Sequence, residues 1–374
     1  MESGRAAGSL SPTSARLRLV VVAGSTRSGT SMAAGSLHHL GLHVPLPVLR
    51  PNDSNPRGFF ESTWPLWFHR RILDKCLVNQ TDGRPEAFRL VAEAVTDAER
   101  TELRDWLAGV FAGDRQVVVK DPRAIWVPWL WEEAAAAVGA STGFLTMIRH
   151  PAEVVASRTT YYHRGRPDHD AWSYRVRNLC TWINANLGIE RQTRDRNRAL
   201  VRYEDLLADW RGEMRTIRDA LDLELDPAMD GSGSHEVDAF IEPELRRHEP
   251  SWDGMDLPSA LVGIAEGTWE ALGAVADGRS SAATAAGLDD LTREYESVMR
   301  VAQAIAQDTA TSRARAARIA GAQEAAADPP VDPASARTGL NGPTGRNRGS
   351  CGLRPIVRRW TPAPIRRIVR RARG

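Results

Sequence analysis

The segment Leu17–Met32, LRLVVVAGSTRSGTSM, constrains the fold more than any other part of the chain. Its apolar first half predicts a buried strand, and its second half predicts a loop that leads into a helix. Backbone N–H groups at a helix start lack partners and the helix dipole adds positive charge there, so such a loop binds anions. The predicted anion-binding residues are consecutive: Gly24, Ser25, Thr26, Arg27, Ser28, Gly29, Thr30 and Ser31.

The spacing of Gly24 and Gly29 matches the first part of a P-loop, in which a glycine lets the backbone approach a phosphate. A nucleoside triphosphatase carries Lys after that glycine, whereas this chain carries Thr30. The positive charge lies inside the loop instead, at Arg27. This difference favours an anion other than the β- and γ-phosphates of magnesium-bound ATP, and we expect no metal cofactor.

Composition limits the class of protein. The chain of 374 residues is 42% hydrophobic, enough for a sizeable core, and its 49 basic and 47 acidic residues nearly cancel, so we expect no nucleic-acid partner. Cys76, Cys180 and Cys351 are too far apart to indicate a disulfide framework or a metal site. Residues 1–16 lack the apolar core of a signal peptide, and Leu17–Ala23 is shorter than the ~20 residues of a membrane span. We therefore expect a soluble cytoplasmic protein.

Strand patterns alternate with helical patterns along the chain. Strands are predicted at Leu17–Ala23, Gln116–Lys120, Thr142–Ile148 and Arg198–Tyr203. Helices are predicted at Thr30–Leu40, Ser62–Leu77, Ala98–Phe111, Ala124–Val138, Trp172–Arg191 and Glu204–Leu221, with another that opens at Pro151. This alternation predicts an α/β fold of P-loop-like type, with three layers and a central parallel sheet flanked by helices. Ligands of such sheets bind at the carboxyl ends of the strands.

A second candidate anion site follows the third predicted strand. Arg149 ends that strand, Pro151 opens the next helix, and Ser157 lies about two turns into it. A guanidinium offers a planar fork of donors that suits phosphate oxygens, and a serine hydroxyl adds another donor. Together with the first loop, this segment predicts a ligand that carries two anionic groups.

Three segments in this order resemble the motifs of sulfotransferases that use 3′-phosphoadenosine 5′-phosphosulfate. They are the loop Gly24–Ser31, the Arg149-x-Pro151…Ser157 segment, and the run Arg202–Leu206, RYEDL. The resemblance extends over about Leu17–Trp252 and implies that the loop holds the 5′-phosphosulfate while Arg149 and Ser157 hold the 3′-phosphate. It also implies a donor-binding role for Tyr203, although acidic residues after a strand equally fit an ordinary helix start. Arg27, where the family often has Lys, is typical of the carbohydrate-modifying branch.

The chemistry implied by this resemblance needs a cation near the transferred group and a base for the acceptor. Arg27 is the first candidate cation. Lys120 is the second, because it precedes Asp121-Pro122-Arg123 in a run that resembles one in bacterial members of the family. Lys120 and Asp121 could equally be solvated charges at the end of a strand, and Arg123 is expected to pair with an acid or brace the loop.

Glu61 is the preferred general base. It ends the segment Asn55–Glu61, NPRGFFE, which is similar to a segment of bacterial sulfotransferases in which a Glu faces the acceptor. Its aromatic neighbours would desolvate the carboxylate and raise its pKa, which suits a base. Alternatively, Glu61 begins the next helix with Ser62 as its cap. His163 and His169 are reserve candidates for the base.

The acceptor is less constrained, and we expect a hydroxyl or amine, with a carbohydrate or glycolipid preferred. The loop Tyr161–Asp170 is a candidate rim of the acceptor site. Tryptophans near the candidate catalytic residues could stack on sugars, although most fit the core better. They are Trp64, Trp67, Trp126, Trp129 and Trp131. Arg246 and Arg247 fall where the family closes a basic segment over the 3′-phosphate.

The resemblance also suggests a division of the chain. We expect a disordered N-terminus at 1–16, a sulfotransferase domain at 17–256, an Ala-rich helical extension at 257–327 and a flexible basic tail at 328–374. Residues 356–373 interleave Ile, Val and Trp with pairs of Arg, a pattern that fits contact with an anionic membrane surface or a solvated tail. Two other functions stay open, namely a P-loop kinase acting on ATP and a non-catalytic nucleotide-binding scaffold.

Overall fold

The computed structural model describes residues 16–53, 55–162, 168–241 and 250–327. The chain divides into two compact units, residues 1–306 and 307–374. Several predictions fall outside the described residues: those for the N-terminus, His163, Arg246, Arg247, the basic tail, and the side chain of His169. None of the described helices combines the length and apolarity needed to cross a membrane.

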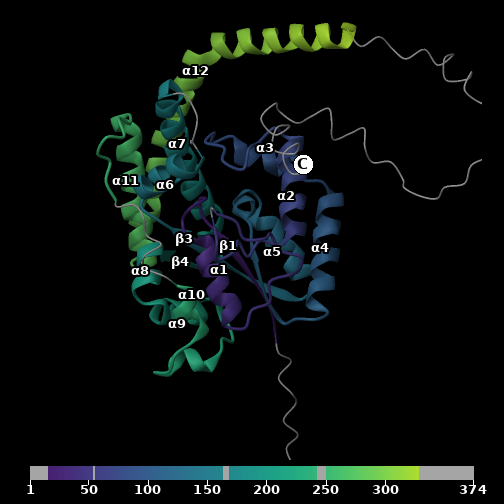
Figure 1. The fold of residues 1–374 in the computed structure, drawn as a ribbon, viewed down its shortest axis with the longest axis vertical. Helices are drawn as coiled ribbons and strands as arrows, with labels where there is room; N and C mark the ends of the chain where they lie inside the picture. Colours follow the sequence, from purple (N-terminus) through teal and green to yellow (C-terminus); the bar gives the residue numbers. More distant parts are fainter. Residues whose placement is uncertain (1–15, 54, 163–167, 242–249, 328–374) are drawn as a thin grey trace, which may run out of the picture. The chain divides into compact units, whose positions relative to one another are not determined.

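Four parallel strands form the central sheet (Figure 1), and hydrogen bonding gives their order as β2-β1-β3-β4. They are β1 (Leu17–Ala23), β2 (Gln116–Lys120), β3 (Ala140–Ile148) and β4 (Arg198–Arg202). The predicted three-layer α/β fold is confirmed. The chain passes from β1 to β2 on one side of β1 and then crosses to β3 on its other side. The direction in which successive strands are added therefore reverses at β1. The carboxyl ends of β1 and β3 therefore frame the position at which such sheets bind ligands.

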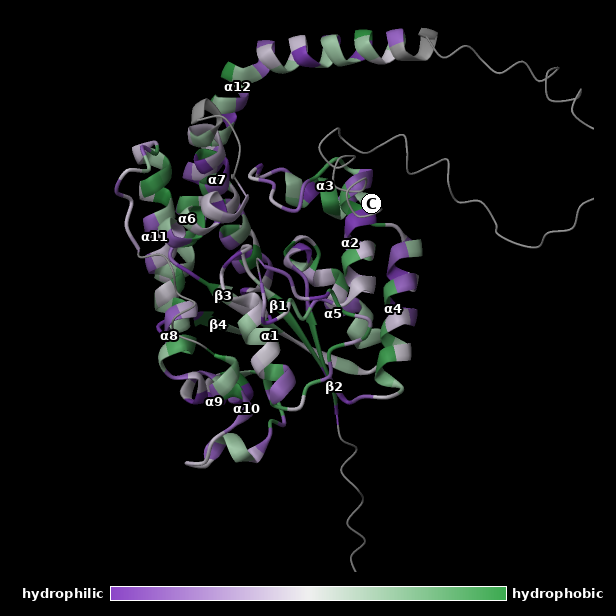
Figure 2. Cartoon of the chain, viewed as in Figure 1, coloured by the Kyte–Doolittle hydropathy of each residue, from purple (hydrophilic) through white to green (hydrophobic). Residues whose placement is uncertain are grey.

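Successive residues of β1 point to opposite faces of the sheet, as the period of a strand requires. Leu19 and Val21 belong to one buried cluster, whereas Val20 and Val22 belong to another. Both faces are covered by helices, so the middle of each strand is mostly apolar (Figure 2). The first face is covered by α2 (Thr63–Lys75), α3 (Ala87–Ala94), α4 (Asp97–Phe111) and α5 (Pro128–Ala137). The second face is covered by α1 (Thr30–His39), α8 (Tyr203–Ala208), α9 (Trp210–Leu221) and α10 (Glu236–Phe240).

A third buried cluster lies beside β4. It is formed by α6 (Pro151–Tyr162), α7 (Asp168–Thr193), α11 (Ser259–Ala276) and the first part of α12 (Ala282–Ala327). Tyr295 of α12 is 1% exposed, and its hydroxyl lies 2.5 Å from the carbonyl of Gly83 and 3.0 Å from that of Cys180. The Ala-rich segment therefore contributes buried side chains to the same unit as the sheet.

Two predicted helices are interrupted, and each break has a local cause. The helix predicted at Ala124–Val138 is divided into a 3₁₀ turn, η1 (Pro122–Trp126), and α5, because Pro128 forces Val127 out of helical geometry. The helix predicted at Glu204–Leu221 is divided into α8 and α9. Asp209 separates them, and its carboxylate accepts a hydrogen bond from the backbone N–H of Gly212 at 2.9 Å. The short helix α3 was not predicted, and a further 3₁₀ turn, η2, covers Pro227–Asp230.

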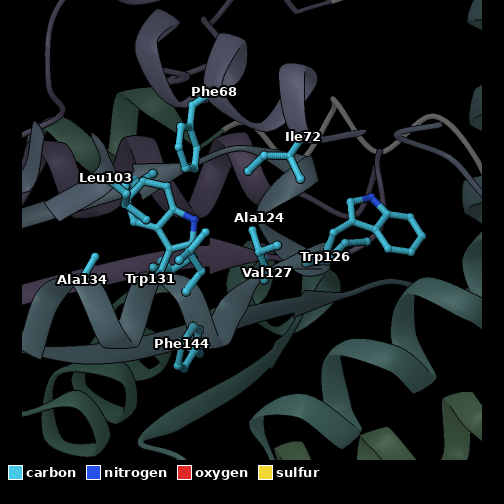
Figure 3. Packing of buried hydrophobic residues seen from close by; sticks show 14 of the residues in the cluster. Phe68, Ile72, Leu103, Ala124, Trp126, Val127, Trp131, Ala134 and Phe144 are labelled. Atoms are coloured by element: carbon cyan, nitrogen blue, oxygen red, sulfur yellow. The ribbon is translucent and has the colours of Figure 1, made fainter. Parts of the chain in front are cut away.

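The tryptophans beside the candidate catalytic residues belong mostly to the core, as expected. Trp126 and Trp131 are 1% and 0% exposed, and both lie in the cluster beneath the first face of the sheet (Figure 3). Trp64 stacks on Trp106 with ring centroids 4.5 Å apart. Trp67 is different, because it is exposed on the surface of α2.

Candidate active site

The loop between β1 and α1 depends on two glycines. Gly24 and Gly29 both have positive φ, at 135° and 88°. A Cβ at Gly24 would collide with the backbone oxygen of Met147, and one at Gly29 would collide with the ring of Tyr203. Glycine is therefore required at both positions for conformation and for close approach to neighbouring elements.

Polar groups gather where this loop enters α1. The hydroxyls of Ser25 and Ser28 are buried and lie 2.6 Å apart. The first helical hydrogen bond of α1 runs from the N–H of Ala33 to the carbonyl of Gly29, at 3.1 Å. The N–H groups of Thr30 and Ser31 therefore precede the helical hydrogen bonds. Both residues line the pocket above the loop, so the loop has the donors of an anion site.

The two predicted anion-binding segments lie side by side. Arg27 has a positive φ of 72°, and its Nε donates to Ser157 Oγ at 3.1 Å. The guanidinium of Arg27 also lies 4.5 Å from the ring centroid of Tyr161. Arg149 Nη1 donates to the backbone oxygen of Arg27 at 3.3 Å. One ligand can therefore contact the loop after β1 and the segment after β3 together.

Arg149 is fixed by three neighbours. Its Nε and Nη2 each lie 2.8 Å from Glu153 Oε2, and Glu153 is 0% exposed. Its guanidinium lies 4.2 Å from the ring centroid of Tyr203, the same ring that packs on Gly29. A guanidinium has five N–H donors. The contacts with Glu153 use the N–H of Nε and one N–H of Nη2, and the contact with the Arg27 carbonyl uses one N–H of Nη1. These contacts leave one N–H on each terminal nitrogen. Arg149 lines the pocket and can offer this remaining fork to a phosphate.

Glu61 and Lys120 form a buried ion pair on the other side of the loop. Lys120 Nζ lies 2.5 Å from Glu61 Oε1, and the two residues are 4% and 7% exposed. Lys120 Nζ also donates to Ser31 Oγ at 3.3 Å, and Asn55 Nδ2 donates to the same hydroxyl at 3.1 Å. This geometry argues against the helix-start interpretation of Glu61, whose carboxylate faces Lys120. Ser62 does occupy the N-cap position of α2, but its hydroxyl donates to the carbonyl of Pro45.

A buried chain of hydrogen bonds supports the turn that follows Lys120. Asp121 Oδ2 lies 2.9 Å from His69 Nδ1, and Trp131 Nε1 donates to His69 Nε2 at 2.9 Å. An indole N–H only donates, so His69 Nε2 is unprotonated and Nδ1 carries the hydrogen that Asp121 accepts. Asp121 Oδ1 accepts from the backbone N–H and Nη1 of Arg123, at 2.9 and 2.8 Å. Arg123, expected to pair with an acid, does so and lines the pocket.

The pKa of the Asp121 carboxyl reflects this chain. Burial acts to raise it, but the interactions with His69 and Arg123 outweigh burial and hold it below its usual range. Because the pKa is lower in the folded protein than in the unfolded chain, this contribution to stability is present at neutral pH. It is lost as the pH falls toward the folded-state pKa.

We expect His69→Ala to lower the free energy of unfolding by about 2–3 kcal/mol, because Asp121 Oδ2 and the Trp131 indole would lose their buried partners. Thermal or urea unfolding measures the change. The matched control is His43→Ala, because His43 pairs with Asp114 at 3.5 Å with its side chain 34% exposed. That change should cost less than about 1 kcal/mol. Equal losses in the two variants would contradict a special role for the buried chain.

One cavity of about 350 Å³ lies among several of these groups. Its wall includes predicted residues from the loop, from the segment before α2 and from the ends of β2, β3 and β4: Thr26, Arg27, Gly29, Thr30, Ser31, Glu61, Lys120, Arg149 and Tyr203. The predicted residues Gly24, Ser25, Ser28 and Ser157 are not among the described residues of this wall. Aromatic rings add apolar surface, from Phe59, Tyr161, Tyr162 and Phe240. No tryptophan is among the described residues of this wall, so the proposed stacking of Trp on the acceptor is not supported.

The comparison with family models decides the class. The model of the Sulfotransferase family matches residues 20–227, which contain the anion loop, Glu61, Lys120, Arg149 and Tyr203. The chain belongs to the sulfotransferase family. Sulfuryl transfer is therefore its reaction class, and the predicted family is confirmed.

Three solved sulfotransferase structures are similar to this chain at low sequence identity. The sulfotransferase domain of the Synechococcus PCC 7002 olefin synthase is 18% identical, with a TM-score of 0.37, over 67% of this chain and 94% of that one. A domain from the curacin biosynthetic pathway is 16% identical, with a TM-score of 0.37, over 69% and 98%. A sulfotransferase from Mycobacterium tuberculosis H37Rv is 16% identical, with a TM-score of 0.34, over 62% and 76%. No curated protein sequence matches.

Within this sulfotransferase, the structure adds residues that the sequence did not single out. Glu153 fixes Arg149, and its place four residues later, in the first turn of the helix that Pro151 opens, was a signal that could have found it. Asn55 contacts Ser31, and His69 supports Asp121. Arg158 donates to Thr26 Oγ1 beneath the loop. Only the fold brings the last three into contact with their partners.

Proposed function

We propose that this protein transfers a sulfuryl group from 3′-phosphoadenosine 5′-phosphosulfate to a hydroxyl of a carbohydrate or glycolipid. The observation that carries the proposal is the bond between Arg27 Nε and Ser157 Oγ, at 3.1 Å. This contact unites the loop after β1 with the helix after β3. A nucleotide with anionic groups at its 5′ and 3′ positions needs two such neighbouring sets of donors.

The residues at and directly behind the pocket wall support the proposed donor; Ser157 is not among the described lining residues but contacts Arg27, which is. The N–H groups and hydroxyls of Gly24–Ser31 suit the 5′-phosphosulfate, and Arg149 with Ser157 suits the 3′-phosphate. The donor supplies the sulfuryl group, and adenosine 3′,5′-bisphosphate is the leaving product. Tyr203 supports this arrangement through its contacts with Arg149 and Gly29.

Glu61 and Lys120 have complementary proposed roles. The acceptor oxygen forms its bond to sulfur as the bond from sulfur to the phosphate oxygen breaks, and the acceptor proton passes to the Glu61 carboxylate. Lys120 and Arg27 stabilise negative charge around the transferred group. Lys120 Nζ suits this role because it lies within hydrogen-bond distance of both Glu61 and Ser31, which belongs to the donor loop.

The acceptor class is proposed from the composition of the pocket wall. Phe59 and Tyr162 offer apolar ring surface, while Gln80 and Asp53 offer hydrogen-bonding groups. A wall that combines aromatic rings with polar groups suits a sugar, whose faces are apolar and whose edges carry hydroxyls.

We expect adenosine 3′,5′-bisphosphate to raise the melting temperature of the protein. A ligand at 100 times its dissociation constant adds about 2.7 kcal/mol of stability. For a domain of this size the expected shift is roughly 5 °C or more. ATP with magnesium should shift the melting temperature far less, because Thr30 replaces the P-loop Lys. A thermal-shift titration with each nucleotide measures both effects.

The opposite ranking, with ATP and magnesium stabilising more strongly, would favour the kinase interpretation. Binding of the bisphosphate without any transfer would favour a non-catalytic scaffold. Transfer from ³⁵S-labelled donor into a cell extract, followed by identification of the labelled product, separates an enzyme from a scaffold and identifies the acceptor.

A further inference from the structure

Arg158 is a buried arginine directly beneath the anion loop. It follows Ser157 in α6 and is 8% exposed. Its Nη1 donates to Thr26 Oγ1, and its Nε donates to Asn178 Oδ1 at 2.7 Å. Tyr174 also hydrogen-bonds to it. All these partners are neutral, and no carboxylate of the described residues forms an ion pair with Arg158.

The pKa of Arg158 is shifted in the opposite direction from that of six other arginines in the described part of the chain. Burial lowers the pKa of the Arg158 guanidinium, and Tyr174 and Tyr162 only partly oppose this effect. Six other arginines have a raised pKa, and the largest cause is in each case a hydrogen bond to a carboxylate: Arg71, Arg84, Arg194, Arg202, Arg211 and Arg218. Arg158 therefore carries a buried charge that no carboxylate of the described residues neutralises.

Three of the cations on the pocket wall are in a different state. Lys120 pairs with Glu61, Arg123 with Asp121, and Arg149 with Glu153. Each of these pairs has a net charge near zero, so their combined field on an anion is weak at a distance. A buried charge without a counter-ion is unfavourable, and a bound anion relieves that cost.

We propose that Arg158 is a positioning residue of the anion site, whose charge acts through Thr26 and is neutralised by a phosphate group of the bound nucleotide. This inference rests on the proposed function, because it requires that the loop Gly24–Ser31 bind a phosphate. Arg158 does not line the pocket, whereas Thr26 does. The guanidinium fixes the Thr26 hydroxyl and places positive charge behind the loop, so it contributes to affinity without touching the ligand.

The test compares charge with hydrogen bonding at this position. Arg158→Gln keeps a hydrogen-bonding side chain and removes the charge, whereas Arg158→Lys keeps the charge and loses the planar fork. Calorimetric titration with adenosine 3′,5′-bisphosphate should show about tenfold weaker binding for Arg158→Gln. Arg158→Lys should bind within about threefold of the unaltered protein. Adenosine, which has no phosphate, should bind all three proteins equally.

Arg198→Gln is the matched control. Arg198 lies at the amino end of β4, away from the pocket, and pairs with Glu190 at 3.2 Å with its side chain 9% exposed. Its loss should lower the melting temperature and leave nucleotide affinity unchanged. If Arg158→Gln also lowers the melting temperature without changing nucleotide affinity, Arg158 has only a structural role. If Arg158→Lys weakens binding as much as Arg158→Gln does, the proposed charge effect is wrong.

The remaining outcomes are also decisive. If Arg158→Gln does not fold, Arg158→Lys decides the question, because retained affinity supports the charge effect and a tenfold loss overturns it. If the unaltered protein does not bind the bisphosphate, the proposed function fails and this inference fails with it. Binding by the unaltered protein with no change in either variant overturns this inference alone.

Discussion

Glu61→Gln is expected to lower the turnover number by about 10²–10⁴-fold while leaving donor affinity nearly unchanged. Gln has the shape of Glu, and its amide oxygen can still accept a hydrogen bond from Lys120, but it cannot take the acceptor proton at neutral pH. Because the loss falls on the chemical step, it should appear in single-turnover transfer from ³⁵S-labelled donor. The dissociation constant of adenosine 3′,5′-bisphosphate should change little, because Glu61 faces Lys120 and not the predicted phosphate contacts.

The control for this result is Glu102→Gln, which removes a carboxylate that pairs with Arg71 on the surface of α4. That variant should retain full turnover. Full turnover in Glu61→Gln would show that Glu61 is not the base and would leave His163 and His169 as the candidates for that role. A large loss of donor affinity in Glu61→Gln would instead indicate that the Glu61–Lys120 pair shapes the donor loop through Ser31.

The strands were predictable because their local sequence determines them. Leu17–Ala23 is buried on both faces, so its apolar run has no competing explanation. The helix breaks at Pro128 and Asp209 were harder to predict. Both residues are visible in the sequence, but the segments on either side of each have helical patterns that favour one continuous helix. The helix α3 was missed because it has only eight residues and follows an irregular loop.

The site was predictable where one segment carries the chemistry. The pair Gly24 and Gly29 indicates the anion-binding loop in the sequence, because the positive φ at both positions favours glycine over other residues. The partners of charged groups were not predictable, since they come from distant parts of the chain. His69 meets Asp121 across 52 positions, and Arg158 meets Thr26 across 132. Whether a charge is paired or left for a ligand thus depends on contacts that only the fold creates.

Arg149→Ala is expected to weaken binding of adenosine 3′,5′-bisphosphate by about 100-fold and also to destabilise the protein. The binding loss follows from removal of a charge-assisted fork, with each hydrogen bond to a charged group worth about 1.5–3 kcal/mol. The stability loss follows from Glu153, which is 0% exposed and would be left without Arg149. Breaking a buried ion pair from one side costs about 3–5 kcal/mol.

The two effects can be separated because they depend on different partners. The double variant Arg149→Met/Glu153→Gln removes both charges, so it should recover most of the stability in thermal unfolding and none of the affinity in titration. Arg194→Ala is the matched control, since Arg194 pairs with buried Glu190 at the same spacing of four residues. Glu190 keeps Arg198 as a partner, so that variant should lose less stability and no affinity. Recovery of nucleotide binding in the double variant would show that Arg149 supports the fold alone and that the 3′-phosphate is held elsewhere.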